Sequence, residues 1–190
     1  MRAVLVAVVL AATAVAADQQ SLPAPWASTY QAPSTRPTVI RNATILTAAG
    51  PAIERGSLLL QNGKVTAVGQ AVNAPADAQV IDASGKWVTP GIIDIHSHLG
   101  VYAAPGIESL QDGNEATSPN TAEVWSEHSI WPQDPQFELA LAGGVTAMQI
   151  LPGSANLFGG RSVTVKNVVS RTAEGMKFPG APYGLKMACG

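Results

Sequence analysis

The sequence predicts an α/β protein in which a small β unit precedes a buried strand–helix–strand segment. Residues 38–89 contain short runs of alternating apolar and polar side chains separated by turn residues, the pattern of half-buried strands. The later run 92–95 is rich in isoleucine, as is typical of a strand covered on both faces of a parallel sheet. A helical pattern separates it from a second apolar run at 145–151. This order indicates a right-handed parallel crossover.

The composition supports a folded protein and excludes several classes. Of the 190 residues, 46% are hydrophobic, which is enough to form a core, and 13% are charged. The net charge of −2 argues against a nucleic-acid partner, which needs a basic face. One cysteine, Cys189, allows neither an internal disulfide nor a thiolate cluster for a metal. The 14 prolines and 18 glycines argue against a coiled coil or a simple helical bundle.

The N-terminal residues have the features of an export signal. Arg2 is followed by an apolar run that ends in small residues at 14–17, so we expect residues 1–17 to be a signal peptide. An uncleaved anchor is the alternative, although the run is shorter than the ~20 residues of a spanning helix. Residues 18–37 are rich in proline, serine and alanine and are expected to form a flexible tether. The mature protein would be periplasmic or secreted, with no stable membrane span.

Residues 38–88 are expected to form one small sheet. The runs 57–61 and 64–68 flank Asn62-Gly63, the strongest short hairpin signal, because both turn positions need a positive φ. Further strands are predicted at 38–47, 79–81 and 86–89. A sheet of this size is marginal alone, so we expect it to pack on another part of the protein.

Residues 89–190 are expected to form the second part. Asp134-Pro135 predicts a helix start and Gly143 its end, and a strand follows at 145–151. A glycine-rich loop spans 152–161, and a strand is expected to start at Gly184. The stretch from Ser118 to Pro132 is predicted to be helical, with Val124, His128 and Trp131 on one face.

The chemistry of the sequence lies at His96 and His98. Side chains alternate along a strand, so these two project on the same face, about 7 Å apart along the backbone, and can converge on one metal ion. Asp94 shares this face and could orient a histidine as an outer carboxylate. Two core or surface histidines without a ligand are the alternative. The pair ends a buried strand, where parallel α/β folds place their active sites, and this favours the metal.

The segment Trp87-Val88-Thr89-Pro90-Gly91-Ile92-Ile93-Asp94-Ile95-His96-Ser97-His98 resembles the signature of the metal-dependent amidohydrolase superfamily. The preceding strands resemble the small β-sandwich attached to such enzymes, and 142–146 and 184–188 resemble the imidazolonepropionase-like branch. The resemblance implies an incomplete (β/α)8 TIM-like barrel, of which only the first strands are present, preceded by part of the sandwich. It also implies a divalent metal, usually zinc, as one or two ions, with His96 and His98 among the ligands.

The sequence departs from that family by what it lacks. A (β/α)8 barrel needs about 250 residues, and only about 100 follow Thr89. The remaining histidine ligands and the general-base aspartate of the family have no candidate here and are expected beyond Gly190. We therefore expect the N-terminal fragment of a longer enzyme, inactive by itself.

Other polar residues are weaker candidates. His128 and Asn156 could bind substrate, although a half-buried helix histidine and a structural loop residue are the alternatives, and the same applies to Ser154 and Arg161. Lys186 could be a carboxylated bridging lysine, but a lysine at the edge of the core is the favoured alternative. Trp125 and Trp131 are expected to serve packing.

The expected function of the full-length enzyme is hydrolysis of a C–N bond in an amide, cyclic amide or small peptide by metal-activated water. Between Lys86 and Arg161 the chain has eight acidic residues and no Lys or Arg, which disfavours anionic partners and hints at a neutral or cationic substrate. The alternatives are an exported metal-binding scaffold without catalytic activity and a degenerate homologue that only binds a ligand. The oligomeric state is not predicted.

Overall fold

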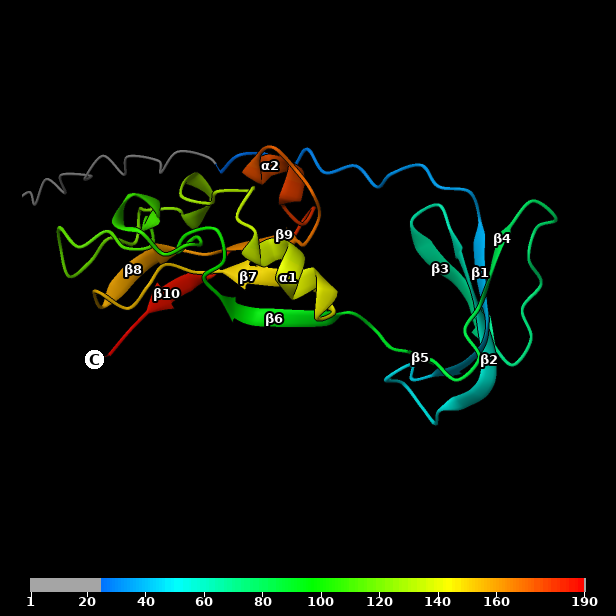
Figure 1. The fold of residues 1–190 in the computed structure, drawn as a ribbon. Helices are drawn as coiled ribbons and strands as arrows, with labels where there is room; N and C mark the ends of the chain where they lie inside the picture. The colour runs from blue at the N-terminus through cyan, green and yellow to red at the C-terminus, as the bar shows by residue number, and fades with distance from the viewer. Residues whose placement is uncertain (1–24, 190) are drawn as a thin grey trace, which may run out of the picture.

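The computed structural model describes residues 25–189 and divides them into two bodies joined by extended segments (Figure 1). The predicted signal peptide, 1–17, and the start of the predicted tether lie outside the described residues. Between residues 25 and 189, no helix is long and apolar enough to cross a membrane. Residues 25–37 contain no helix or strand, although part of this stretch is held against the second body, as described below.

The first body is a five-stranded sheet. It consists of β1 (Thr38–Ile45), β2 (Ile53–Gln61), β3 (Lys64–Gly69), β4 (Gln79–Asp82) and β5 (Trp87–Val88). The order is β3-β2-β1-β4, with β5 also paired to β1. The predicted hairpin is confirmed, because β2 and β3 are antiparallel and Asn62 and Gly63 have φ of 54° and 71°. Its small core contains Ala43, Ile45, Leu58 and Ala83. The sandwich implied by the family resemblance stays a prediction.

The second body contains two mixed or antiparallel sheets and few helices. β6 (Ile92–Ser97), β7 (Val145–Ile150) and β9 (Val163–Lys166) form one sheet in the order β6-β7-β9, and β8 (Phe158–Arg161) pairs with β10 (Leu185–Met187) in another. The helices are α1 (Gln136–Ala142) and α2 (Ala173–Met176), with the 3-10 turns η1 (Glu108–Leu110) and η2 (Ser126–His128). β6 and β7 are parallel and α1 lies between them in sequence, which confirms the predicted strand–helix–strand unit.

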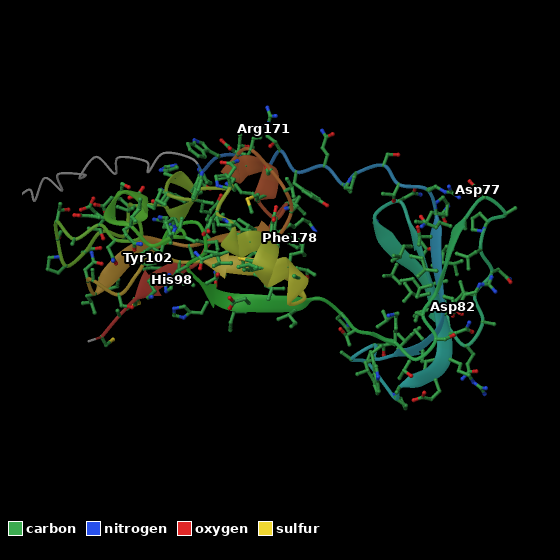
Figure 2. The ribbon with its side chains drawn as sticks, in the orientation of Figure 1. Asp77, Asp82, His98, Tyr102, Arg171 and Phe178 are labelled. Carbon is green, nitrogen blue, oxygen red and sulfur yellow. The ribbon has the colours of Figure 1, made fainter. Side chains whose placement is uncertain are left out.

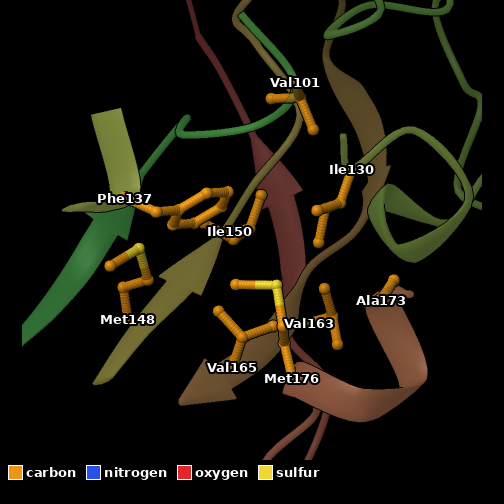
Figure 3. Packing of buried hydrophobic residues seen from close by; sticks show 9 residues of the cluster. All are labelled: Val101, Ile130, Phe137, Met148, Ile150, Val163, Val165, Ala173 and Met176. Carbon is orange, nitrogen blue, oxygen red and sulfur yellow. The ribbon is translucent and has the colours of Figure 1, made fainter. Parts of the chain in front are cut away.

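One apolar cluster holds the second body together (Figure 3). Met148 and Ile150 of β7 are fully buried and pack with Phe137 of α1 and Met176 of α2. The loop after β6 contributes to the same cluster through Val101 and Ile130. The chain directly after the histidine pair is therefore anchored to the core of the body.

The expectation that β6 is buried on both faces is wrong. Ile92, Ile93 and Ile95 are 54%, 67% and 75% exposed, and only Ser97 of this strand is buried. The reason is topological, because within residues 25–189 β6 is the edge strand of its sheet and pairs with β7 alone. The isoleucine-rich run correctly predicted a strand beside β7. In the part of the chain that the structure describes, however, the isoleucine side chains of this strand remain exposed to solvent.

Two further expectations are corrected in the loops. The predicted helix from Ser118 to Pro132 reduces to the single turn η2, because this segment pairs with β8: Thr121 N donates to the carbonyl of Phe158, and Trp125 forms a parallel bridge with Arg161. These bonds satisfy main-chain groups that a helix would satisfy internally. The strand at Lys186 is present, but β10 is antiparallel to β8 and lies outside the β6–β7 sheet.

Candidate functional site

His96 and His98 lie side by side where β6 ends. Their ring centroids are 5.1 Å apart with the ring planes at 81°, so the predicted juxtaposition is confirmed. The His96 side chain is exposed and that of His98 is half-buried. Two imidazoles this close, with one ring open to solvent, can approach the same ligand.

A main-chain carbonyl fixes the orientation of His98. Its Nδ1 lies 2.9 Å from the carbonyl oxygen of Leu151, the residue that follows β7. A carbonyl can only accept, so Nδ1 carries a proton, and in the neutral ring the lone pair is therefore on Nε2. Metal-binding histidines are commonly oriented by such a bond at the second ring nitrogen. The rings of His98 and Tyr102 form a T-shaped pair, with centroids 5.5 Å apart and ring planes at 74°, and the two residues are labelled in Figure 2.

Asp94 does not orient a histidine ring, contrary to the sequence-based expectation. Its Oδ1 accepts a 3.0 Å hydrogen bond from the main-chain N–H of His96. The physical reason is local, since a short aspartate side chain readily bonds the backbone two residues further along the chain. Asp94 thus fixes the backbone of the pair, and the ring of His98 is fixed from β7 instead.

A residue whose tertiary role the sequence did not reveal holds the chain after the pair. Asp134 is 2% exposed and accepts hydrogen bonds from the main-chain N–H groups of Gly100, Ala104 and Gln136, at 2.9, 3.3 and 3.1 Å. The Asp-Pro motif correctly indicated the start of α1, which begins at Gln136. The bonds to Gly100 and Ala104 span at least 30 residues and have no local sequence signal.

The loops after β6 and β7 close on each other beside His98. The N–H of Gly153 donates to the carbonyl of Gly113 at 2.7 Å, and the Asn114 amide donates to the Tyr102 hydroxyl. Gly113 is packed so tightly on the Tyr102 ring that a Cβ there would come within 2.3 Å of it. The positions of Tyr102 and His98 therefore depend on both loops.

A small cavity with a mixed polar and apolar lining lies between these loops. Its lining includes Asp112, Asn114, Glu115, Ser126 and Ser129. The Ser126 hydroxyl is buried and has no hydrogen-bond partner among the described residues. Hydrogen bonds from the hydroxyl and main-chain N–H of Thr117 lower the pKa of Glu115, so this carboxyl is ionised at neutral pH. The lining of the cavity therefore includes at least one ionised carboxyl.

The contacts of the other predicted site residues are structural. The ring of His128 packs on Trp26 at 4.5 Å, and the Asn156 amide donates to the carbonyl of Glu115 and the hydroxyl of Thr121. Substrate binding by either residue stays a prediction.

The same holds for the predicted packing and bridging residues. Trp125 is buried beneath Arg161, as expected of a packing residue, whereas Ser154 and Trp131 are exposed. Lys186 is buried and its Nζ donates to the carbonyl of Pro152 at 3.2 Å. From residue 25 to 189, no three or more His, Cys, Asp or Glu residues converge as a metal site, so the histidine pair has no third side chain of this kind beside it within this part of the chain.

Comparisons with known proteins give the family context. The chain is 36% identical to the amidohydrolase tasK of Hapsidospora irregularis over 82% of its length, and 32% identical to a dihydroorotase of Geobacter sulfurreducens over 63%. The crystal structure of an amidohydrolase from Thermotoga maritima matches 80% of the chain with a TM-score of 0.74 and 41% identity. The homologues of the present chain are amidohydrolases. The resemblance found in the sequence is thereby confirmed.

The match covers only part of each amidohydrolase. The chain spans 18% of tasK, 23% of the dihydroorotase and 39% of the Thermotoga protein. No family model matches the chain. The amidohydrolase relationship therefore concerns the small sheet and the body that carries the histidine pair.

Proposed function

We propose that this chain is the N-terminal part of a metal-dependent amidohydrolase and supplies two of its metal ligands, His96 and His98. The observation that carries the proposal is the orientation of His98, whose Nδ1 is committed to the Leu151 carbonyl so that Nε2 is left as a ligand. The proposed reaction is hydrolysis of a C–N bond in an amide, cyclic amide or small peptide. The 190-residue chain is proposed to be inactive alone.

The residues present suit a divalent metal such as zinc. Both candidates are imidazoles, a ligand type that zinc favours, and their rings lie next to each other at the end of β6. When bound, the ion would supply Lewis-acid activation of water and of the substrate carbonyl. Further ligands and the general base would come from sequence beyond Gly190.

The chain's own residues orient the site and select what enters it. Asp94 and the Leu151 carbonyl fix the backbone of His96 and the ring of His98. Asp134 holds the backbone immediately after the pair, at Gly100. An ionised Glu115 in the lining of the cavity beside Tyr102 and Asn114 disfavours an anionic group, so we propose that the cavity accepts a neutral or cationic part of the substrate.

The site can be tested by Zn²⁺ titration of the chain with ¹⁵N-labelled histidines. The protein has only three histidines, so each ring can be followed separately. We expect Zn²⁺ to shift the Nε2 resonance of His98, while Nδ1 stays protonated, and to shift a ring nitrogen of His96. The double variant His96→Ala/His98→Ala should lose the binding at least tenfold, and His128→Ala is the matched control that should keep it.

Two results would contradict the metal site. One is a proton on Nε2 of His98 in the metal-free protein, because it would remove the proposed ligand atom. The other is unchanged Zn²⁺ affinity in the double variant. If the metal binds but the protein extended past Gly190 hydrolyses no amide, the non-catalytic metal-binding homologue is the better description.

A further inference from the structure

The stretch that follows the predicted signal peptide is held against the second body. Residues 25–31, here named the N-terminal strap, run beside α2 before the chain crosses to β1 (Figure 1). The strap contains no helix or strand, yet Trp26, Ser28 and Thr29 all make hydrogen bonds to residues about 100 to 150 positions further along the chain. A freely moving tether would not make such specific contacts.

A buried ion pair forms hydrogen bonds with both main-chain groups of Trp26. The N–H of Trp26 donates to Oε1 of Glu127 at 2.9 Å, and Nζ of Lys177 donates to the Trp26 carbonyl. Glu127 and Lys177 are themselves an ion pair and are 1% and 5% exposed. The ion pair thus satisfies both the main-chain N–H and the main-chain carbonyl of Trp26, as a neighbouring β-strand would.

Three more contacts extend the recognition along the strap. The Trp26 ring packs against His128, the Ser28 hydroxyl donates to the Lys177 carbonyl at 2.8 Å, and the Thr29 N–H donates to the Glu174 carbonyl at 3.0 Å. The strap is therefore bound through an aromatic side chain, one hydroxyl and three main-chain groups. Most of these depend on an extended backbone rather than on a particular sequence.

We propose that Glu127, Lys177 and the main chain of α2 form a peptide-binding surface, whose occupant is the N-terminal strap of the same chain. Glu127 and His128 belong to η2, which lies in the long loop between the histidine pair and α1. Lys177 directly follows α2 on the opposite side of the surface. Because the strap forms hydrogen bonds to both Glu127 and Lys177, it shields their ion pair from solvent and holds the loop that contains η2 against α2.

The test compares strap variants of the full chain by the reactivity of Lys177. Trp26→Ala removes the ring that packs on His128, and Trp26→Pro also removes the N–H that Glu127 accepts. We expect amine-modifying reagents to label Lys177 at least tenfold faster in Trp26→Pro, with a smaller increase in Trp26→Ala. Hydrogen exchange should rise in residues 121–131 and 173–178. Ser34→Ala is the matched control, because Ser34 is exposed and lies in the same stretch outside the strap.

Addition of a synthetic peptide of residues 24–32 to Trp26→Pro should restore the protection of Lys177, and a peptide with Ala at the tryptophan should restore less. Unchanged labelling of Lys177 in Trp26→Pro would overturn the proposal. Dependence of the protection on protein concentration would also overturn it, because the occupant would then come from a second copy. If hydrogen exchange shows that β6 and β7 unfold in Trp26→Pro, Ser28→Ala replaces it, and equal labelling there counts against the strap. None of these readings requires a metal or hydrolysis.

Discussion

The Glu127–Lys177 cluster and the His96–His98 pair use polar side chains in opposite ways. Both carboxylate oxygens of Glu127 and the ammonium of Lys177 have partners within the chain, and both side chains are buried. His98 commits one ring nitrogen to the Leu151 carbonyl, and His96 is exposed. The difference separates polar groups whose partners all lie within the fold from polar groups that keep a free ring nitrogen or an exposed ring, which we propose bind a metal. Residue type alone cannot separate the two kinds of site, because both consist of titratable side chains.

The largest effect is expected from breaking the buried pair. Lys177→Met leaves the Glu127 carboxylate buried without its counterion and should lower the free energy of unfolding by about 3–5 kcal/mol, measured by urea denaturation. The double variant Glu127→Gln/Lys177→Met should recover part of this loss, because no uncompensated charge remains. If Lys177→Met is as stable as the parent chain, the cluster is not the structural element described here.

A smaller effect is expected at Asp134, which holds the main chain just after the histidine pair. Asp134→Ala leaves the N–H groups of Gly100, Ala104 and Gln136 without their acceptor and should cost about 2–3 kcal/mol. Asp134→Asn keeps one acceptor oxygen and should cost about half as much. Hydrogen exchange at Gly100 should report the loss directly. Equal stability of the Ala and Asn variants would contradict the role of the second oxygen.

The histidine pair should contribute little to stability. His98→Ala removes one hydrogen bond to a carbonyl and should cost about 1 kcal/mol, while the exposed His96 should be replaceable within about 0.5 kcal/mol. Urea denaturation of the metal-free variants measures both values. A loss of several kcal/mol in His96→Ala would place this side chain among the structural groups and abolish the contrast with Glu127.

The effect expected last appears only at alkaline pH. Burial disfavours the charged form of Lys177, but hydrogen bonds and charge interactions with Glu127 and Tyr183 outweigh this and raise the pKa of Lys177 above 10.5. Because the folded pKa is the higher one, the stabilisation is complete below about pH 10 and is lost as the pH rises through the folded value. Unfolding measured between pH 8 and 11 should show this loss in the parent chain. In Glu127→Gln/Lys177→Met the loss should be smaller.

Local sequence signals predicted the parts of this fold that depend on neighbours in sequence. Asn62-Gly63 gave the hairpin, and Asp134-Pro135 with Gly143 bounded α1, because positive φ angles and helix ends are set by adjacent residues. The juxtaposition of His96 and His98 followed from strand alternation in the same way.

The errors concern pairing over long distances. The burial of β6 depends on whether a second strand lies beside it, and the pairing of residues 120–125 with β8 replaced a helix that the local pattern favoured. The carbonyl that orients His98 comes from a residue 53 positions away. Residues 18–37 were predicted to be a flexible tether because their composition is that of a linker, and the partners of the strap within them lie about 100 to 150 positions further along the chain.

The exposed edge of β6 affects how the purified chain will behave. Its isoleucines face solvent, and the main-chain groups along its outer side are free to pair with an identical edge, since within residues 25–189 β6 pairs only with β7. An apolar edge of this kind is a template for aggregation. Self-association through this edge should therefore increase with protein concentration, and dilute samples should stay monodisperse longest.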